Sequence, residues 1–96
     1  MRAEISYDLI MDENMAFVEG TYRLPGGTWQ VFIFSRAPVA QPQWRSTAWQ
    51  SGVSGVFIQF PESEQLNKRA VEQFLSGVLG VEEWVEARGP DSLQLR

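Results

Sequence analysis

Apolar and polar residues alternate with a period of two along several stretches of this chain. The first stretch covers residues 3–11, where one side collects Ala3, Ile5, Tyr7, Leu9 and Met11 and the other Glu4, Ser6 and Asp8. Such alternation predicts a half-buried strand, because neighbouring side chains of a strand point to opposite faces. Similar patterns predict strands over residues 15–24, 28–36, 53–60, 81–88 and 92–95.

The region around the second strand leaves one alternative open. Residues 8–19 are rich in Leu, Met, Glu and Ala, which favour helices, and Gly20 could end a helix there. In the strand interpretation, Gly20 marks a bulge. The turn from Leu24 to Thr28 is clearer, because Pro25 presets φ and the two glycines after it permit positive φ. It predicts a hairpin between the second and third strands.

Helical periodicity follows residues 53–60. Pro61-Glu62-Ser63-Glu64 predicts the start of a helix, with Ser63 or a neighbour as N-cap, and Gly77 and Gly80 predict its end. Apolar residues at helical spacing predict one buried face: Leu66, Ala70, Val71, Phe74, Leu75, Val78 and Leu79. In the strand that follows, we expect Val81, Val85 and Ala87 inward, and Glu82, Trp84, Glu86 and Arg88 outward.

The resulting order, β-β-β-β-α-β-β, predicts a single α+β domain over residues 1–96. We expect an antiparallel sheet of about five or six strands with one helix packed on one face. The C-terminal half, with its step Leu79-Gly80-Val81, resembles half of a ferredoxin-like domain, in which a strand, a helix and a hairpin follow in order. Heavy-metal-associated domains share this rhythm but carry a Cys-x-x-Cys motif, which is absent here. The resemblance implies a fold and no function.

The 96 residues include no cysteine and no histidine. This excludes disulfides, thiolate nucleophiles, iron–sulfur clusters, imidazole bases and zinc sites built on thiolate or imidazole. The single lysine, Lys68, falls on the predicted polar side of the helix, so no Ser–Lys hydrolase is indicated. Glu82, Glu83 and Glu86 are typical of a solvated acidic surface rather than a cation site. We expect no catalytic residues, no metal and no cofactor.

The net charge of −4 bears on the partners. A protein that binds phosphate backbones usually carries a basic face, and no strong basic cluster occurs here, so no nucleic-acid partner is expected. No apolar run reaches the ~18 residues that a membrane-spanning helix needs. The opening Met1-Arg2-Ala3-Glu4 lacks the apolar region of a signal peptide. We expect a soluble, cytoplasmic protein without a membrane partner.

Residues 37–51 form the first candidate interaction site. The pattern there is aperiodic, and long loops within compact domains are usually functional. The segment contains Trp44, Arg45 and Trp49, and Arg36 precedes it. Trp and Arg are enriched at binding hot spots, which makes these four residues candidates for binding another protein. The alternative is that the tryptophans fold back and cover the core.

The third and fourth strands carry the second candidate site, because both are apolar on both faces. Their exposed candidates are Trp29, Phe32, Ile33, Phe34 and Phe57. One helix covers only one face of a sheet, and a large exposed apolar patch marks an interface. These residues therefore predict a homodimer joined through the sheet. A sheet that curls into a half-barrel and covers itself is the alternative.

The sequence thus predicts a small non-catalytic binding module. Its first expected partner is a second copy, met through the sheet, and its second is another protein, met through residues 37–51. The alternative is a ligand-binding or cofactor-independent enzymatic domain with a pocket between sheet and helix. An enzyme would show Arg, Asp or Tyr side chains converging in a cleft.

Overall fold

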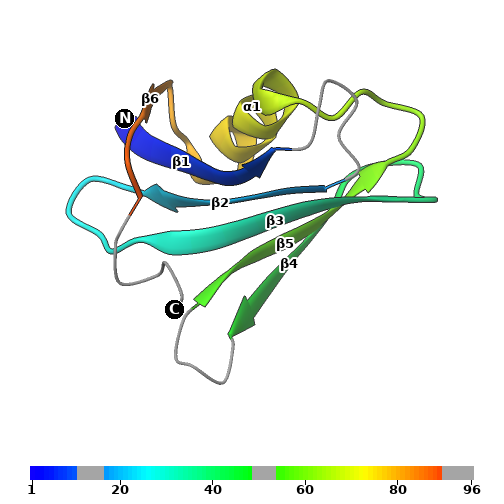
Figure 1. The fold of residues 1–96 in the computed structure, drawn as a ribbon, viewed down its shortest axis with the longest axis horizontal. Coiled ribbons are helices and arrows are strands. Elements are labelled where there is room, and N and C mark those ends of the chain that lie inside the picture. The colour runs from blue at the N-terminus through cyan, green and yellow to red at the C-terminus, as the bar shows by residue number, and fades with distance from the viewer. Residues whose placement is uncertain (11–16, 49–53, 90–96) are drawn as a thin grey trace.

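The structure is a computed structural model that describes residues 1–10, 17–48 and 54–89. These residues form one helix and a six-stranded sheet with the order β4-β5-β3-β2-β1-β6 (Figure 1). The elements are β1 (Arg2–Ile10), β2 (Phe17–Arg23), β3 (Gln30–Ala37), β4 (Gln43–Ala48), β5 (Ser54–Pro61), α1 (Lys68–Leu79) and β6 (Glu83–Glu86). The predicted α+β class with a single helix is confirmed. The strand predicted over residues 92–95 lies outside the described residues.

The sheet is mixed, so the prediction of an antiparallel sheet is wrong. The pairs β1–β2, β2–β3 and β4–β5 are antiparallel, whereas β3–β5 and β1–β6 are parallel. The cause is the extra strand β4, from which the chain returns as β5 beside β3. After β5, α1 crosses the sheet and delivers β6 to the far edge. The ferredoxin-like detail is not confirmed, because the described strand after the helix pairs with β1.

The helix begins later than the sequence predicts. Asn67 is the N-cap, and its side-chain oxygen accepts a hydrogen bond of 2.9 Å from the backbone N–H of Ala70. The expected start at Pro61 and cap at Ser63 are wrong, because Pro61 ends β5. At the other end Gly80, with a φ of 74°, donates its N–H to the Ser76 carbonyl, which confirms the predicted end. Gly77 lies within the helix.

The first two strands confirm the alternation with one irregularity. Ala3 and Ile5 are buried as predicted. The register then shifts between Tyr7 and Leu9, after which Leu9 pairs with Glu19 rather than continuing the register of Ala3 and Ile5. The irregularity predicted at Gly20 therefore occurs on the opposite strand. Because β1 continues to Ile10 and β2 begins at Phe17, the alternative helix over residues 8–19 is wrong.

The predicted hairpin between β2 and β3 is confirmed. The N–H of Gly27 donates to the carbonyl of Leu24 at 2.9 Å, and Gly26 has a φ of 77°. This positive φ is the conformation that glycine adopts without steric cost. The turn therefore fixes the register of the two central strands, in which Gly20 pairs with Phe32.

The core lies between α1 and one face of the sheet, and Figure 1 shows the helix on the side near β1. Its members are Ile5, Val18, Tyr22, Phe32, Phe34, Val56, Ile58, Phe60, Leu66, Val71 and Leu75. Gly20 lies between Tyr7 and Phe32 in the register, and these two rings meet edge to face with centroids 6.0 Å apart. A methyl group on Gly20 would lie 2.6 Å from Phe32 Cζ and would also meet the Ser6 carbonyl oxygen. Only glycine, which has no Cβ, therefore fits at position 20 without displacing its neighbours.

Gly20→Ala and Gly77→Ala should change stability in opposite directions. A Cβ at Gly20 overpacks the core, which should lower the free energy of unfolding by about 1–3 kcal/mol. A Cβ at Gly77 meets nothing within 4 Å, so alanine should raise it by about 0.5–1 kcal/mol through helix propensity. Urea denaturation of both variants measures this. A Gly20→Ala protein as stable as the wild type would contradict the packing described here.

Candidate functional site

The sheet face opposite the helix carries a row of apolar residues. In the register Ile33 lies between Glu19 and Phe57, and Val31 lies between Thr21 and Gly55. These positions alternate with Phe32 and Phe34, which face the helix, so they point to the other side. Val31, Ile33 and Phe57 are half-buried in the chain on its own. We call the face formed by these three residues the outer face.

Phe32 and Phe34 were expected in the self-association surface, and this expectation is wrong. Both side chains are 0% exposed and belong to the core under α1. The sequence pattern showed that β3 is apolar on both sides, but it could not show which side the helix covers. Of the five residues predicted for self-association, Ile33 and Phe57 lie on the outer face. Trp29 lies just before β3 and is half-buried.

Part of the sheet next to the outer face is already covered. Gly89 lies so close to β1 and β2 that a Cβ there would be 2.9 Å from Ser6 Oγ and 3.2 Å from Thr21 Oγ1. Ser6 and Thr21 are accordingly only 7% and 2% exposed. Gly89 therefore shields these two polar side chains from water. The apolar residues of β3 and β5 keep partial exposure.

The four residues predicted to bind another protein do not form one site. Arg36 donates hydrogen bonds to the backbone carbonyls of Glu62 and Glu64, so it fastens the segment that precedes α1. Trp44 pairs with Ile58 and Arg45 with Phe57, two positions on opposite faces of β5. Trp49 lies outside the described residues. The aperiodic loop expected over residues 37–51 is wrong in part, since Gln43–Ala48 is the edge strand β4.

Trp44 is the predicted residue that the structure leaves most clearly accessible. It is 36% exposed, and its ring lies 6.3 Å from that of Phe74 on the helix. Val78, one helical turn after Phe74, is 46% exposed, although its spacing predicted burial. Its exposure was not visible in the sequence, because the 3.6-residue period marks a broad apolar stripe and not its edges. Trp44, Phe74 and Val78 form a smaller apolar patch, the edge patch.

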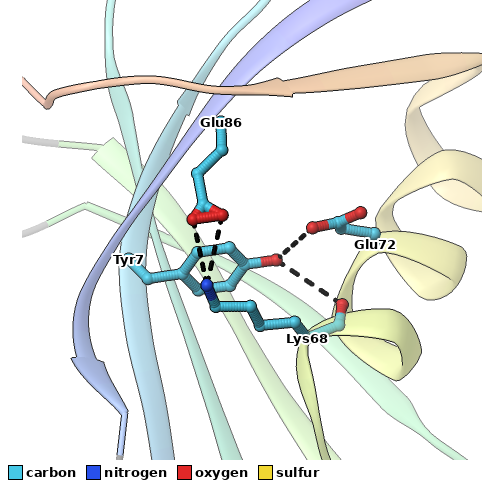
Figure 2. A network of polar contacts seen from close by, with 4 residues as sticks. All are labelled: Tyr7, Lys68, Glu72 and Glu86. Atoms are coloured by element: carbon cyan, nitrogen blue, oxygen red, sulfur yellow. Dashed lines mark hydrogen bonds and ion pairs between the residues drawn. The ribbon is translucent and has the colours of Figure 1, made fainter.

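A polar network fastens the helix to both β1 and β6, and Figure 2 shows its four side chains converging. The Tyr7 hydroxyl donates to Glu72 Oε2 at 2.7 Å. Lys68 Nζ pairs with Glu86 Oε2 at 2.9 Å and lies 4.9 Å from the centre of the Tyr7 ring. Burial, followed by the hydrogen bond and the charge of Glu72, raises the pKa of Tyr7 above its ordinary value of 10.0. A tyrosine held neutral in this way donates a hydrogen bond and serves poorly as a base.

Trp84 anchors β6 to the same side. Its Nε1–H donates to Ser76 Oγ at 2.8 Å and to the Glu72 carbonyl at 3.2 Å. Its ring meets Tyr22 edge to face at 6.4 Å. The outward position predicted for Trp84 is therefore wrong. The alternation in β6 was identified correctly, but the helix lies over the side that was expected to face water.

No group of three or more acidic residues able to hold a metal ion occurs in the part of the chain that the structure describes. The space between sheet and helix, where a pocket was expected, is filled by the core. Within residues 1–10, 17–48 and 54–89, no helix is long and apolar enough to cross a bilayer.

No protein-family model, curated protein or solved structure matches this chain.

Alkaline pH should reveal the Tyr7 contact. The folded state holds the Tyr7 proton more tightly than the unfolded state, whose pKa is near 10, so stability falls as pH rises above about 10. Burial raises the pKa of Tyr22 as well, and its contribution has the same sign. Tyr7→Phe removes one of these two titrating groups. Its denaturation midpoint should therefore fall less between pH 9 and pH 11 than that of the wild type.

Measurement at neutral pH provides the control for this prediction. There Tyr7→Phe loses the hydrogen bond to Glu72 and should be less stable by about 1 kcal/mol. Equal alkaline slopes for variant and wild type, measured by urea denaturation at each pH, would contradict the link between Tyr7 and stability.

Proposed function

We propose that this protein is a non-catalytic binding module whose first partner is a second copy, joined through the outer face. The observation that supports this is the partial exposure of Val31, Ile33 and Phe57 on neighbouring central strands. Central strands with apolar residues on both faces need cover on both, and α1 covers only one. Pairing of two outer faces supplies the second cover.

The composition of the outer face fits such an interface. Its centre is apolar, and Glu19, Ser35 and Gln59 lie around it in the same register. An apolar centre with a polar rim is the usual anatomy of protein–protein interfaces. The facing positions of β3 and β5 carry no charged residue between residues 31 and 35 or between 55 and 59. Two copies, each with a net charge of −4, therefore meet at an apolar centre, with Glu19 beside Ile33 as a charged residue at its rim.

A two-fold axis through this face makes the contact self-complementary, because the same residues meet from both copies.

The edge patch is the competing surface. Trp44, Phe74 and Val78 lie at the β4 edge on the helix side, so they cannot join an interface formed by the outer face. The outer face is favoured as the main contact because its residues lie on neighbouring strands, β3 and β5, inside the sheet and not at its edge. The interaction with another protein predicted for this region stays a prediction, and Trp44 is the residue that would carry it.

Sedimentation analysis at micromolar concentration tests the proposal. The wild type should have about twice the chain mass of 10.9 kDa. Ile33→Asp with Phe57→Ser should give a folded monomer, because a charge in the centre of the interface costs several kcal/mol unless it is paired. Circular dichroism of the variant shows whether the fold is kept.

Trp44→Ser with Val78→Ser is the control, since it changes two apolar residues that are more exposed and lie on the helix side. The control should keep the dimer mass. A wild type that sediments as a single species of 10.9 kDa would overturn the proposal. A dimer lost only in the control would move the interface to the edge patch.

A further inference from the structure

A hollow of about 560 Å³ lies where the start of β1, the β2–β3 turn and β6 meet. It is separate from the core and from the centre of the outer face. Ala3, Leu24, Pro25 and Val85 supply the apolar part of its lining. Its volume falls within the ~300–1,000 Å³ typical of small-molecule sites.

Two arginines supply the polar part of the lining, and Arg23 is held in place. Its Nε donates to Glu4 Oε1 at 2.8 Å, and its Nη2 lies 2.5 Å from the same oxygen. Its guanidinium carbon also lies 4.9 Å from the centre of the Trp29 ring. Both contacts with Glu4 use one edge of the guanidinium, so the other edge keeps donors for a ligand. A group fixed in this way loses little side-chain entropy on binding.

The second arginine, Arg2, is positioned more loosely. Its Nε lies 3.9 Å from Glu83 Oε1, and its side chain is 69% exposed. A long, exposed ion pair contributes little to stability, so Arg2 can exchange it for a ligand at small cost. The lining contains two guanidinium groups against one carboxylate, Glu4. Glu83 pairs with Arg2 from outside the lining, so the two guanidinium groups face two carboxylates, and a ligand takes Arg2 by displacing Glu83.

We propose that this hollow binds a small carboxylate with an apolar body. The planar guanidinium fork matches the two oxygens of a carboxylate, which explains the charged end of the ligand. The apolar lining explains its body, because transfer of a short hydrocarbon chain out of water is favourable. An inorganic anion would contact the arginine side chains but leave the apolar lining exposed to water. A neutral alcohol would use the lining and leave Arg2 and Arg23 with their glutamate partners, Glu83 and Glu4.

NMR titration of the uniformly ¹⁵N-labelled chain with hexanoate tests this inference. The backbone amides of Gly26, Gly27 and Val85 should shift on addition. Hexanol lacks the charge and inorganic phosphate lacks the apolar body, and each should bind at least about fivefold more weakly than hexanoate. Equal affinity for hexanol and hexanoate, or no shift at these amides, would overturn the proposal.

Substitutions separate the site from general charge effects. Arg2→Gln should weaken hexanoate binding about fivefold and leave hexanol binding unchanged, and Arg2→Lys should have a smaller effect. Arg69→Gln removes the same charge from the exposed surface of α1 and should leave hexanoate binding unchanged. If Arg2→Gln and Arg69→Gln weaken binding equally, the hollow is not the site.

The inference is independent of the dimer. The variant Ile33→Asp with Phe57→Ser changes no residue of the hollow, so it should still bind hexanoate whether or not the wild type self-associates. Loss of hexanoate binding in this variant, with the fold retained, would contradict a self-contained site within one copy.

Discussion

The closure of two aromatic rings over Gly20 is the constraint on which the sheet depends. Tyr7 and Phe32 lie on either side of this glycine and meet above it edge to face. Phe32 in turn meets Phe34, which meets Phe74 of the helix at 5.7 Å. The same Tyr7 bonds to Glu72, so one contact aligns three strands and positions α1. A side chain at Gly20 would separate these rings and loosen each of the contacts that follow from them.

This arrangement produces a molecule with two unlike sides. On the helix side, aromatic packing and the hydrogen bonds of Tyr7 and Trp84 leave little room for a ligand. On the other side Gly89 covers Ser6 and Thr21 but leaves the centre of β3 and β5 half-exposed. Both proposed sites lie on the side without the helix because the helix side is already filled.

The sequence was informative wherever a short-range cause decides the structure. Alternation located five of the six strands, and Pro25 with its two glycines located the hairpin, because strand period and turn geometry are local properties. The sequence was not informative where packing between distant segments determines the local structure. The residues of β4 show no clear alternation, and their strand conformation follows from pairing with β5. Asn67 was passed over as a cap because Ser63 offered the same chemistry earlier.

For the candidate sites too, the sequence indicated what depends on residue type and missed what depends on the path of the chain. Trp44 was chosen from residue type alone, and its partial exposure in β4 keeps it a candidate. Phe32 and Phe34 were misplaced because the identity of the covered face depends on the path of the chain after β5. The hollow at Arg2 and Arg23 had no sequence signal, because its residues come from both ends of the described chain. The two arginines become neighbours through the antiparallel pairing of β1 with β2, in which Glu4 lies opposite Arg23, and the parallel pairing of β1 with β6 adds Val85 to the lining.

That parallel pairing also has a consequence for synthesis on the ribosome. β1 is made first, yet its outer partner β6 follows α1 in the chain, so Arg2 meets Glu83 only after nearly all the described residues have been translated. Until then, β1 is an unpaired edge whose N–H and C=O groups can pair with a neighbouring nascent chain. Contacts of such sequence separation also form slowly. The arrival of β6 therefore covers Arg2–Ile5 of β1 and leaves the four-residue β6 as the new edge of the sheet.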